Sequence, residues 1–270
     1  MNENEQILTA ILDCRRVDLL AQPPTLTLQQ QNQYEHIKER RLQGESLQYL
    51  LGFSDFMGFR LKIDPRVLVP RPETEILVEQ AILKISTLPS KPLRILDVGT
   101  GSGNIAIALA KSIKNCQVVA LDVSQDALDV ASQNAKENGV QEKIQFHHDN
   151  VINFFYDKTR WNSFDVIISN PPYVPSGEIE NLPQDVQHEP RLALDGGQDG
   201  LEFYRVLLNR AHRFLKEEGY LFLEIGDNQR AGIEEILKEC PHYEDVNFIQ
   251  DYNHRDRIGF LKKGSGQWKN

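Results

Sequence analysis

The sequence lacks the features that mark membrane, secreted and metal-binding proteins. It has no apolar run of the roughly 20 residues that span a bilayer, and its polar, acidic N-terminus, MNENEQIL, is unlike a signal peptide. Its three cysteines are odd in number, far apart and without metal-ligand spacing. We therefore expect a cytoplasmic protein in a reducing compartment, with no membrane association and no metal site.

Positive charge is also scarce. The 30 lysines and arginines are outnumbered by 39 acidic residues, which gives a net charge of −9. This balance disfavours a surface built mainly to grip phosphate backbones, so we expect no direct nucleic acid binding. The composition, 40% hydrophobic and 26% charged, is that of a soluble globular protein. A chain of 270 residues allows one large domain with a smaller appendage.

Residues 1–51 predict a small helical domain with little core of its own. Apolar side chains at helical spacing predict one helix over residues 5–20. A second helix is expected after Thr27, which can cap it, and should end at Gly44. A short third turn follows in ESLQYLL. Because the segment is polar, rich in glutamine and free of cofactor motifs, we expect it to bind a partner.

Residues 52–70 predict a β-hairpin linker, because aromatic and alternating apolar residues surround Gly58. RPETE then begins a helix with Pro72 in its first turn. Strands and helices alternate afterwards, which predicts an α/β domain over residues 71–270, with a parallel sheet covered on both faces. Within it, residues 201–218 predict one helix. Only DYNHRD joins the last two strands, which is too short for a parallel crossover, so this pair should be antiparallel.

A glycine loop lies between the first strand of this domain and the helix that follows that strand. Glycines in such a loop allow a sharp turn and close approach of a ligand. The spacing is G-x-G-x-G, whereas dinucleotide sites use G-x-G-x-x-G. Asp97, just before the loop, would repel a pyrophosphate and suit an ammonium or sulfonium group. The pattern favours S-adenosyl-L-methionine (SAM), and the candidate cofactor-binding residues of the loop are Gly99, Thr100, Gly101, Ser102 and Gly103.

Acidic and amide side chains follow the next two strands. Asp122 ends a strand about 20 residues after the glycine loop, where a carboxylate accepts hydrogen bonds from ribose hydroxyls. This position would serve NAD or SAM equally. Asp149 and Asn150 end the third strand and are candidates for binding the adenine amino group.

SNPPYV follows the apolar strand FDVIIS. The prolines fix the backbone and hold Asn170 out of the helical region. Their carbonyls and the Asn170 side-chain oxygen form a rigid set of acceptors, suited to an incoming NH2 group. Such acceptors can orient the nitrogen lone pair toward a sulfonium methyl, so positioning would supply most of the catalysis. The candidate substrate-binding residues are Asn170, Pro171, Pro172 and Tyr173.

These motifs resemble the class I SAM-dependent methyltransferases that modify planar NH2 groups. The flanks YLLGFSDFMGFRLKIDPRVLVPRPETEILVEQA, HEPRLALDGGQDGLEFYR and LFLEIGDNQ are similar to the release factor glutamine N5-methyltransferases (PrmC/HemK type), from about Tyr49 to Phe260. The resemblance implies a Rossmann-like, seven-stranded catalytic domain preceded by a helical domain and a hairpin linker. It also implies methylation of the glutamine in the Gly-Gly-Gln motif of class-one peptide chain release factors.

The resemblance also implies roles for individual residues. Gly99 to Gly103 and Asp122 would hold SAM, with S-adenosyl-L-homocysteine (SAH) as the product. The side chain of the substrate glutamine would lie against the segment from Asn170 to Tyr173, with Asn170, Pro171 and Tyr173 catalytic and Asn170 also near the cofactor. The partner would be a release factor, and we expect a monomer.

Other functions remain open at this point. A sister family sharing NPPY methylates a glutamine of a ribosomal protein, and N/D-P-P-Y also serves adenine N6-methylation of nucleic acids. The acidic balance disfavours the nucleic acid substrate. An NAD-dependent oxidoreductase is disfavoured by the glycine spacing, and a non-catalytic SAM-binding module would leave NPPY without a purpose.

Overall fold

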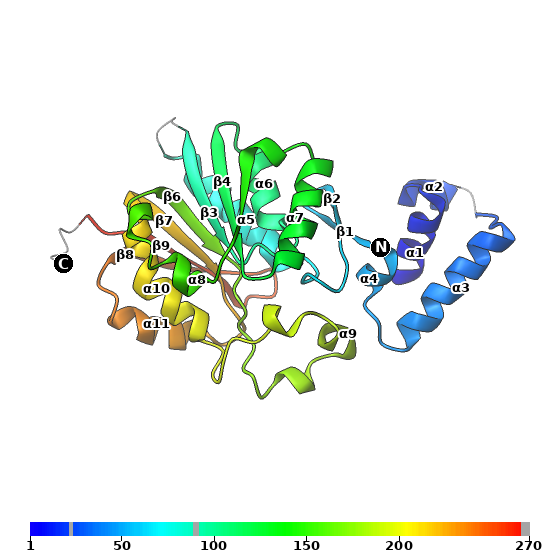
Figure 1. Ribbon diagram of the computed structural model, residues 1–270. Coiled ribbons are helices and arrows are strands. Elements are labelled where there is room, and N and C mark those ends of the chain that lie inside the picture. Colours follow the sequence, from blue (N-terminus) through cyan, green and yellow to red (C-terminus); the bar gives the residue numbers. More distant parts are fainter. Residues whose placement is uncertain (22–23, 89–91, 266–270) are drawn as a thin grey trace.

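The computed structural model describes residues 1–21, 24–88 and 92–265. Within them, a seven-stranded sheet of order β5-β4-β3-β6-β7-β9-β8 lies at the centre of the larger domain (Figure 1). Its strands are β3 (Leu93–Val98), β4 (Cys116–Asp122), β5 (Ile144–His148), β6 (Phe164–Ser169), β7 (Leu215–Glu224), β8 (Tyr243–Gln250) and β9 (Asp256–Lys263). The first five are parallel, and β9 is antiparallel to β7 and β8. The predicted fold class and antiparallel final pair are confirmed.

Helices cover both faces of this sheet (Figure 1). On one face they are α5 (Pro72–Ile85), α6 (Asn104–Ser112) and α7 (Gln125–Glu137), and on the other α8 (Val151–Phe154), α10 (Glu202–Phe214) and α11 (Arg230–Lys238). Strand β6 contributes to both cores: Val166 and Ile168 pack on the α5 side, and Phe164 and Ile167 on the α10 side. Burial on both faces explains why its sequence is a continuous apolar run.

Short helical turns occupy the connections between these elements. They are η1 (Gln141–Lys143), η2 (Lys158–Arg160), η3 (Ile179–Asn181), α9 (Gln184–Gln187) and η4 (Arg191–Ala193). The last three lie in the long segment between β6 and α10, which begins with Asn170.

The N-terminal helices are α1 (Glu3–Leu12), α2 (Arg16–Ala21), α3 (Leu28–Leu42) and α4 (Leu47–Leu51). The prediction of one helix over residues 5–20 was wrong. Asp13 adopts a left-handed conformation with φ of 47° and ends α1, and the Arg15 backbone N–H then donates to Asp18 at the start of α2. The predicted cap at Thr27 is confirmed, since its side chain accepts from the Gln30 backbone N–H.

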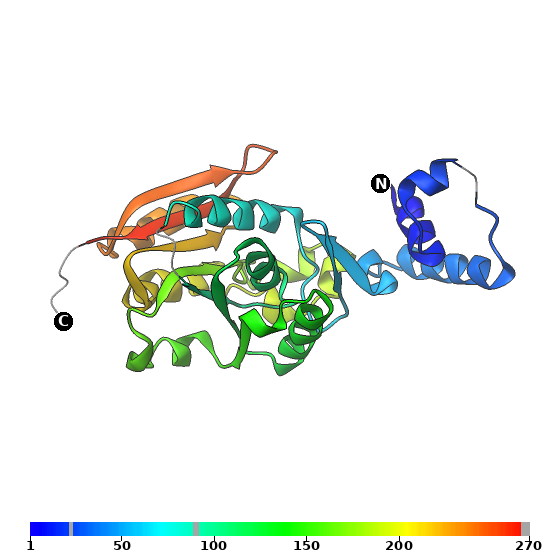
Figure 2. The ribbon, with the colours of Figure 1, turned by 90° about the horizontal axis from the view of Figure 1, so that it is seen from above.

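These helices project away from the sheet domain (Figure 2). Ile7, Ile37 and Leu47 are the buried apolar residues of their small core. The predicted hairpin is confirmed by β1 (Phe53–Phe56) and β2 (Phe59–Lys62), which pair across the turn Met57–Gly58. Both turn residues have positive φ, 47° and 79°, as a two-residue hairpin turn of type I′ requires.

The helix predicted over residues 201–218 is shorter in the structure. α10 ends at Phe214, and β7 begins at Leu215 by pairing with β6. Lys216 forms a 2.6 Å ion pair with Asp165 of β6, and Glu218 has a positive φ of 65° at the irregularity that follows. Strand pairing therefore overrides the helix propensity of the charged LKEE segment.

Candidate active site

The glycine loop and Asn170 follow neighbouring strands. Val98 at the end of β3 is paired with Ser169 at the end of β6, and the Ser169 hydroxyl donates to the Val98 carbonyl over 2.7 Å. A Cβ atom added at Gly99 would lie 4.0 Å from the Asn170 carbonyl oxygen. The two motifs therefore meet at the carboxyl edge of the sheet, where open α/β folds bind their ligands.

A cavity of about 210 Å³ lies at this edge. Most of the site residues expected from the sequence line it, although they come from four different strand ends. These are Gly99, Gly101, Asp122, Asp149, Asn150, Asn170, Pro171 and Pro172. The fold thus gathers the glycine loop, the acidic strand ends and the Asn-Pro-Pro segment around one space.

Asp122 is fixed by the backbone around it. Its Oδ2 accepts from the Gly101 N–H and its Oδ1 from the Ser124 N–H, each over 2.9 Å. The pKa of the Asp122 carboxyl is raised, because the effect of burial exceeds the opposing effect of these backbone hydrogen bonds. A carboxylate oxygen accepts more than one hydrogen bond, so both oxygens keep capacity for a pair of ligand hydroxyls.

Three residues of the glycine loop lie beneath the cavity rather than on its wall. Thr100 and Ser102 are each 2% exposed, and a Cβ atom at Gly103 would lie 3.1 Å from the Ala131 side chain.

Asp97 was expected from the sequence to face the ligand, but its carboxylate does not face the cavity. It is 0% exposed and accepts from the Thr100 hydroxyl over 2.6 Å, and burial raises its pKa to about 7.

Tyr173 is not among the residues that line the cavity. Its carbonyl accepts from the Gln229 side-chain amide over 2.9 Å, and burial raises the pKa of its phenol. A Cβ atom at Gly226 would lie 2.9 Å from its ring. Tyr173 thus holds the Asn-Pro-Pro segment against the end of β7.

Further residues of the cavity were not found from the sequence. Three come from the segment after the hairpin and five from the segment before α10 and from α10 itself: Arg66, Val67, Leu68, Pro190, Leu192, Ala193, Phe203 and Leu207. Most of them belong to irregular segments, which have no periodic pattern in the sequence. The only available signal was the apolar character of DPRVLVP, which is typical of a segment packed against other parts of the protein.

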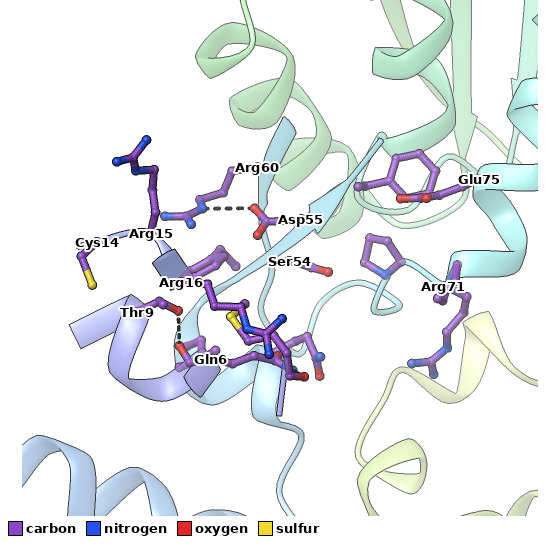
Figure 3. Close-up of a pocket in the computed structure, with 17 residues that line it drawn as sticks. Gln6, Thr9, Cys14, Arg15, Arg16, Ser54, Asp55, Arg60, Arg71 and Glu75 are labelled. Carbon is purple, nitrogen blue, oxygen red and sulfur yellow. Dashed lines mark hydrogen bonds and ion pairs between the residues drawn. The ribbon is translucent and has the colours of Figure 1, made fainter. Parts of the chain in front are cut away.

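A second cavity, of about 500 Å³, lies between the N-terminal helices and the hairpin (Figure 3). Its lining includes arginines from both sides, namely Arg15, Arg16, Arg60 and Arg71. One chain segment connects the two cavities, since 66–68 line the first and 70–72 the second. A ligand in the second cavity would therefore contact the segment that also lines the first.

The described residues show neither a membrane-spanning helix nor a metal-binding cluster. None of the helices in residues 1–21, 24–88 and 92–265 is long and apolar enough to cross a membrane. The same residues contain no group of three or more His, Cys, Asp or Glu side chains that could hold a metal ion.

Comparisons with known proteins agree with this architecture. Residues 89–269 match the family described as "Methyltransferase domain", and residues 2–52 match "PrmC N-terminal domain". A "Release factor glutamine methyltransferase" of Thermodesulfovibrio yellowstonii is 35% identical over 97% of this chain and 92% of its own length. Its counterpart from Chlorobaculum tepidum is 39% identical over 94% of this chain and 87% of its own length.

Solved structures show the same fold. A methyltransferase from Pyrococcus furiosus superimposes with a TM-score of 0.54 and 21% identity, and the match covers 85% of this chain and 99% of that one.

Proposed function

The chain belongs to the family of release factor glutamine methyltransferases, and from this premise we propose that it methylates the glutamine of the Gly-Gly-Gln motif in class-one peptide chain release factors. The methyl group passes from SAM to the side-chain amide nitrogen, and SAH is released. The observation that carries the proposal is the position of Asn170 and Pro171 in the cavity that also contains the glycine loop and Asp122.

The cavity residues divide into a cofactor part and a substrate part. The backbone of Gly99 and Gly101 would lie against SAM, and Asp122 would accept hydrogen bonds from its ribose hydroxyls. Asp149 is the better acceptor for the adenine amino group, because only one of its two carboxylate oxygens accepts a backbone N–H, from Asn150 over 2.8 Å, whereas the single Asn150 side-chain oxygen already caps α8 by accepting from the Ile152 N–H over 2.8 Å. This assignment leaves the Asn-Pro-Pro segment for the substrate.

The chemistry requires orientation more than proton transfer. An amide nitrogen has a delocalised lone pair and is a poor nucleophile. Hydrogen bonds from its NH2 group to the Asn170 side-chain oxygen and the Pro171 carbonyl fix the nitrogen so that the lone pair faces the sulfonium methyl. The leaving group is a neutral thioether, so the reaction needs no general acid. The N-methylated amide forms as a cation, and it loses one N–H proton to solvent to give the neutral N-methyl amide.

The cofactor assignment predicts selective binding of SAH. The G-x-G-x-G loop lacks the longer spacing that presents a helix N-terminus to a pyrophosphate. Calorimetric titration should therefore show saturable binding of SAH and none of NAD. Saturable binding of NAD without SAH would contradict the cofactor assignment.

Asp122→Ala should weaken SAH binding by about 1.5–3 kcal/mol, the scale for loss of a charged hydrogen-bonding partner. The same calorimetric titration measures this change. Asp126→Ala, on the exposed first turn of α7, is a suitable control because Asp126 does not line the cavity. Equal affinities of the Asp122→Ala variant and the unchanged protein would remove Asp122 from the cofactor site.

We further propose that residues 1–51 form a partner-recognition domain, 52–70 a hairpin linker and 71–270 the catalytic domain of a cytoplasmic monomer. The cavity in Figure 3 supports this division, because a release factor seated there would touch the N-terminal helices and the segment that leads to the active site. The protein substrate is favoured over nucleic acid by the net charge of −9.

Labelled SAM distinguishes the candidate substrates. The enzyme would be incubated separately with a purified release factor, with ribosomal proteins and with adenine-containing DNA, and peptide mass mapping would follow. We expect label in the release factor alone. Label only in a ribosomal protein or in DNA would replace the proposed substrate.

A further inference from the structure

The Asn170 side chain is held by two buried residues that lie far from it in the sequence. Its Nδ2 donates to Thr74 Oγ1 over 3.1 Å, and the Thr74 hydroxyl donates to Glu224 Oε2 over 2.7 Å. Thr74 lies in the first turn of α5 and Glu224 at the end of β7. Each is 1% exposed, so this hydrogen-bond chain is shielded from water.

While Glu224 is ionised, the chain of hydrogen bonds has only one possible direction. A threonine hydroxyl carries one hydrogen, and Thr74 gives it to Glu224. Thr74 Oγ1 can then only accept, so the Asn170 NH2 group must point toward it. The Asn170 side-chain oxygen must therefore point the other way. If the amide were reversed, its oxygen would face the lone pairs of Thr74 Oγ1, and an NH2 group would face the substrate.

We propose that Thr74 and Glu224 are positioning residues, which act through Asn170 by making its side chain present an acceptor oxygen, and not a donor NH2, to the substrate amide. The proposal rests on the proposed function, in which the substrate group is itself an NH2 donor. Two donors facing each other could not hold the substrate nitrogen, so the direction of the buried hydrogen bonds decides whether Asn170 orients or repels the substrate.

The surroundings of Glu224 suit this role. Its backbone carbonyl accepts from the Tyr204 hydroxyl over 3.0 Å, which fixes the end of β7. Burial raises the pKa of the Glu224 carboxyl to about 7; the Thr74 hydrogen bond and the positive charges of Arg257 and Arg71 oppose this rise, and the charge of Glu73 adds to it. The titratable and charged groups that face it are Arg257 of β9, Arg71 and Glu73 at the start of α5, Tyr173 after β6 and Tyr204 of α10.

Protonation of Glu224 would reverse the hydrogen bonds. A protonated carboxyl can donate to Thr74 Oγ1, which frees the Thr74 hydrogen for the Asn170 oxygen and favours the reversed amide. The ionised form, present above the Glu224 pKa, is the one that supports catalysis. Methyl transfer should therefore slow as the pH falls through about 7.

Substitution of Thr74 tests the hydroxyl directly. Thr74→Val keeps the shape but has no hydroxyl, whereas Thr74→Ser keeps the hydroxyl and loses a methyl group. In single-turnover methyl transfer to a release factor, Thr74→Val should be slower by on the order of tenfold or more, and Thr74→Ser should stay within about threefold. SAH affinity, which also reports folding, should change by less than about threefold in both, because Thr74 does not line the cofactor cavity.

Glu224→Gln tests the carboxylate. Its side chain keeps an acceptor oxygen but does not ionise, so the fall in rate below about pH 7 should be present in the unchanged enzyme and absent in this variant. The proposal is overturned if Thr74→Val transfers methyl at the normal rate, if Thr74→Ser is as slow as Thr74→Val, or if the pH profile survives Glu224→Gln. Failure of the unchanged enzyme to methylate any release factor would instead reject the proposed function.

Discussion

Replacing Asn170 with alanine is expected to slow methyl transfer by on the order of a hundredfold or more, comparable to the loss of one preorganised polar group in other enzymes. The substitution removes the acceptor oxygen but leaves the backbone fixed by Pro171 and Pro172. Cofactor affinity should change by less than about threefold, because Gly99, Gly101 and Asp122 remain. Single-turnover methyl transfer and SAH titration of the same variant separate the two effects.

Two further variants sharpen this test. Asn170→Asp keeps an acceptor oxygen but adds a charge and removes the donor to Thr74, so it should also be slow. Asn247→Ala changes an exposed asparagine in β8, far from the carboxyl end of β6, and should behave as the unchanged protein. Normal methyl transfer by a folded Asn170→Ala variant would show that SNPPYV is only a turn.

Removing residues 1–51 is expected to lower kcat/KM on an intact release factor by on the order of a hundredfold, equivalent to about 3 kcal/mol of lost recognition. The N-terminal helices form one side of the cavity in Figure 3. No described residue before Arg66 lines the cofactor cavity, so a chain beginning at Gly52 should bind SAH as the full chain does. Steady-state methyl transfer and SAH titration measure the two properties.

A full-length control addresses the contacts that hold the two domains together. Arg41 forms a 3.3 Å ion pair with Asp185, and the Gln184 side chain donates to the Gln43 carbonyl over 3.0 Å. Gln184→Ala removes one of these contacts and leaves every residue of the N-terminal helices unchanged, so it should retain most activity. Full activity of the shortened chain on an intact release factor would refute the recognition role of residues 1–51.

The sequence predicted where most strands lie along the chain and that the last pair is antiparallel, because the relevant signals are local. Apolar runs bounded by glycine, proline or a capping residue identify buried strands and helix starts. The errors occurred where local signals competed with tertiary contacts. Asp13 ends α1 in a left-handed conformation within an otherwise helical pattern, and Leu215 leaves the helix because β6 offers a pairing partner.

The site was predictable only where its residues belong to continuous motifs. Asn170 and Asp122 follow strands at recognisable positions, so their meeting at one sheet edge could be inferred. Thr74 and Glu224 are 150 residues apart and hydrogen-bond only because α5 packs beside the end of β7. Periodicity does not reveal such a pair. Nor could it show that Asp97 is buried beneath the loop rather than exposed to the ligand.

The position of the transferred methyl group decides whether the Gly-Gly-Gln glutamine is the acceptor. A release factor isolated in unmethylated form would be incubated with the enzyme and SAM, digested, and fragmented in a mass spectrometer to locate the added methyl group. We expect one methyl group on the side-chain nitrogen of the glutamine in the Gly-Gly-Gln motif, and none when the enzyme has been heat-denatured beforehand. A methyl group on any other residue, or an unmodified Gly-Gly-Gln peptide in the presence of enzyme that binds SAH, would contradict it.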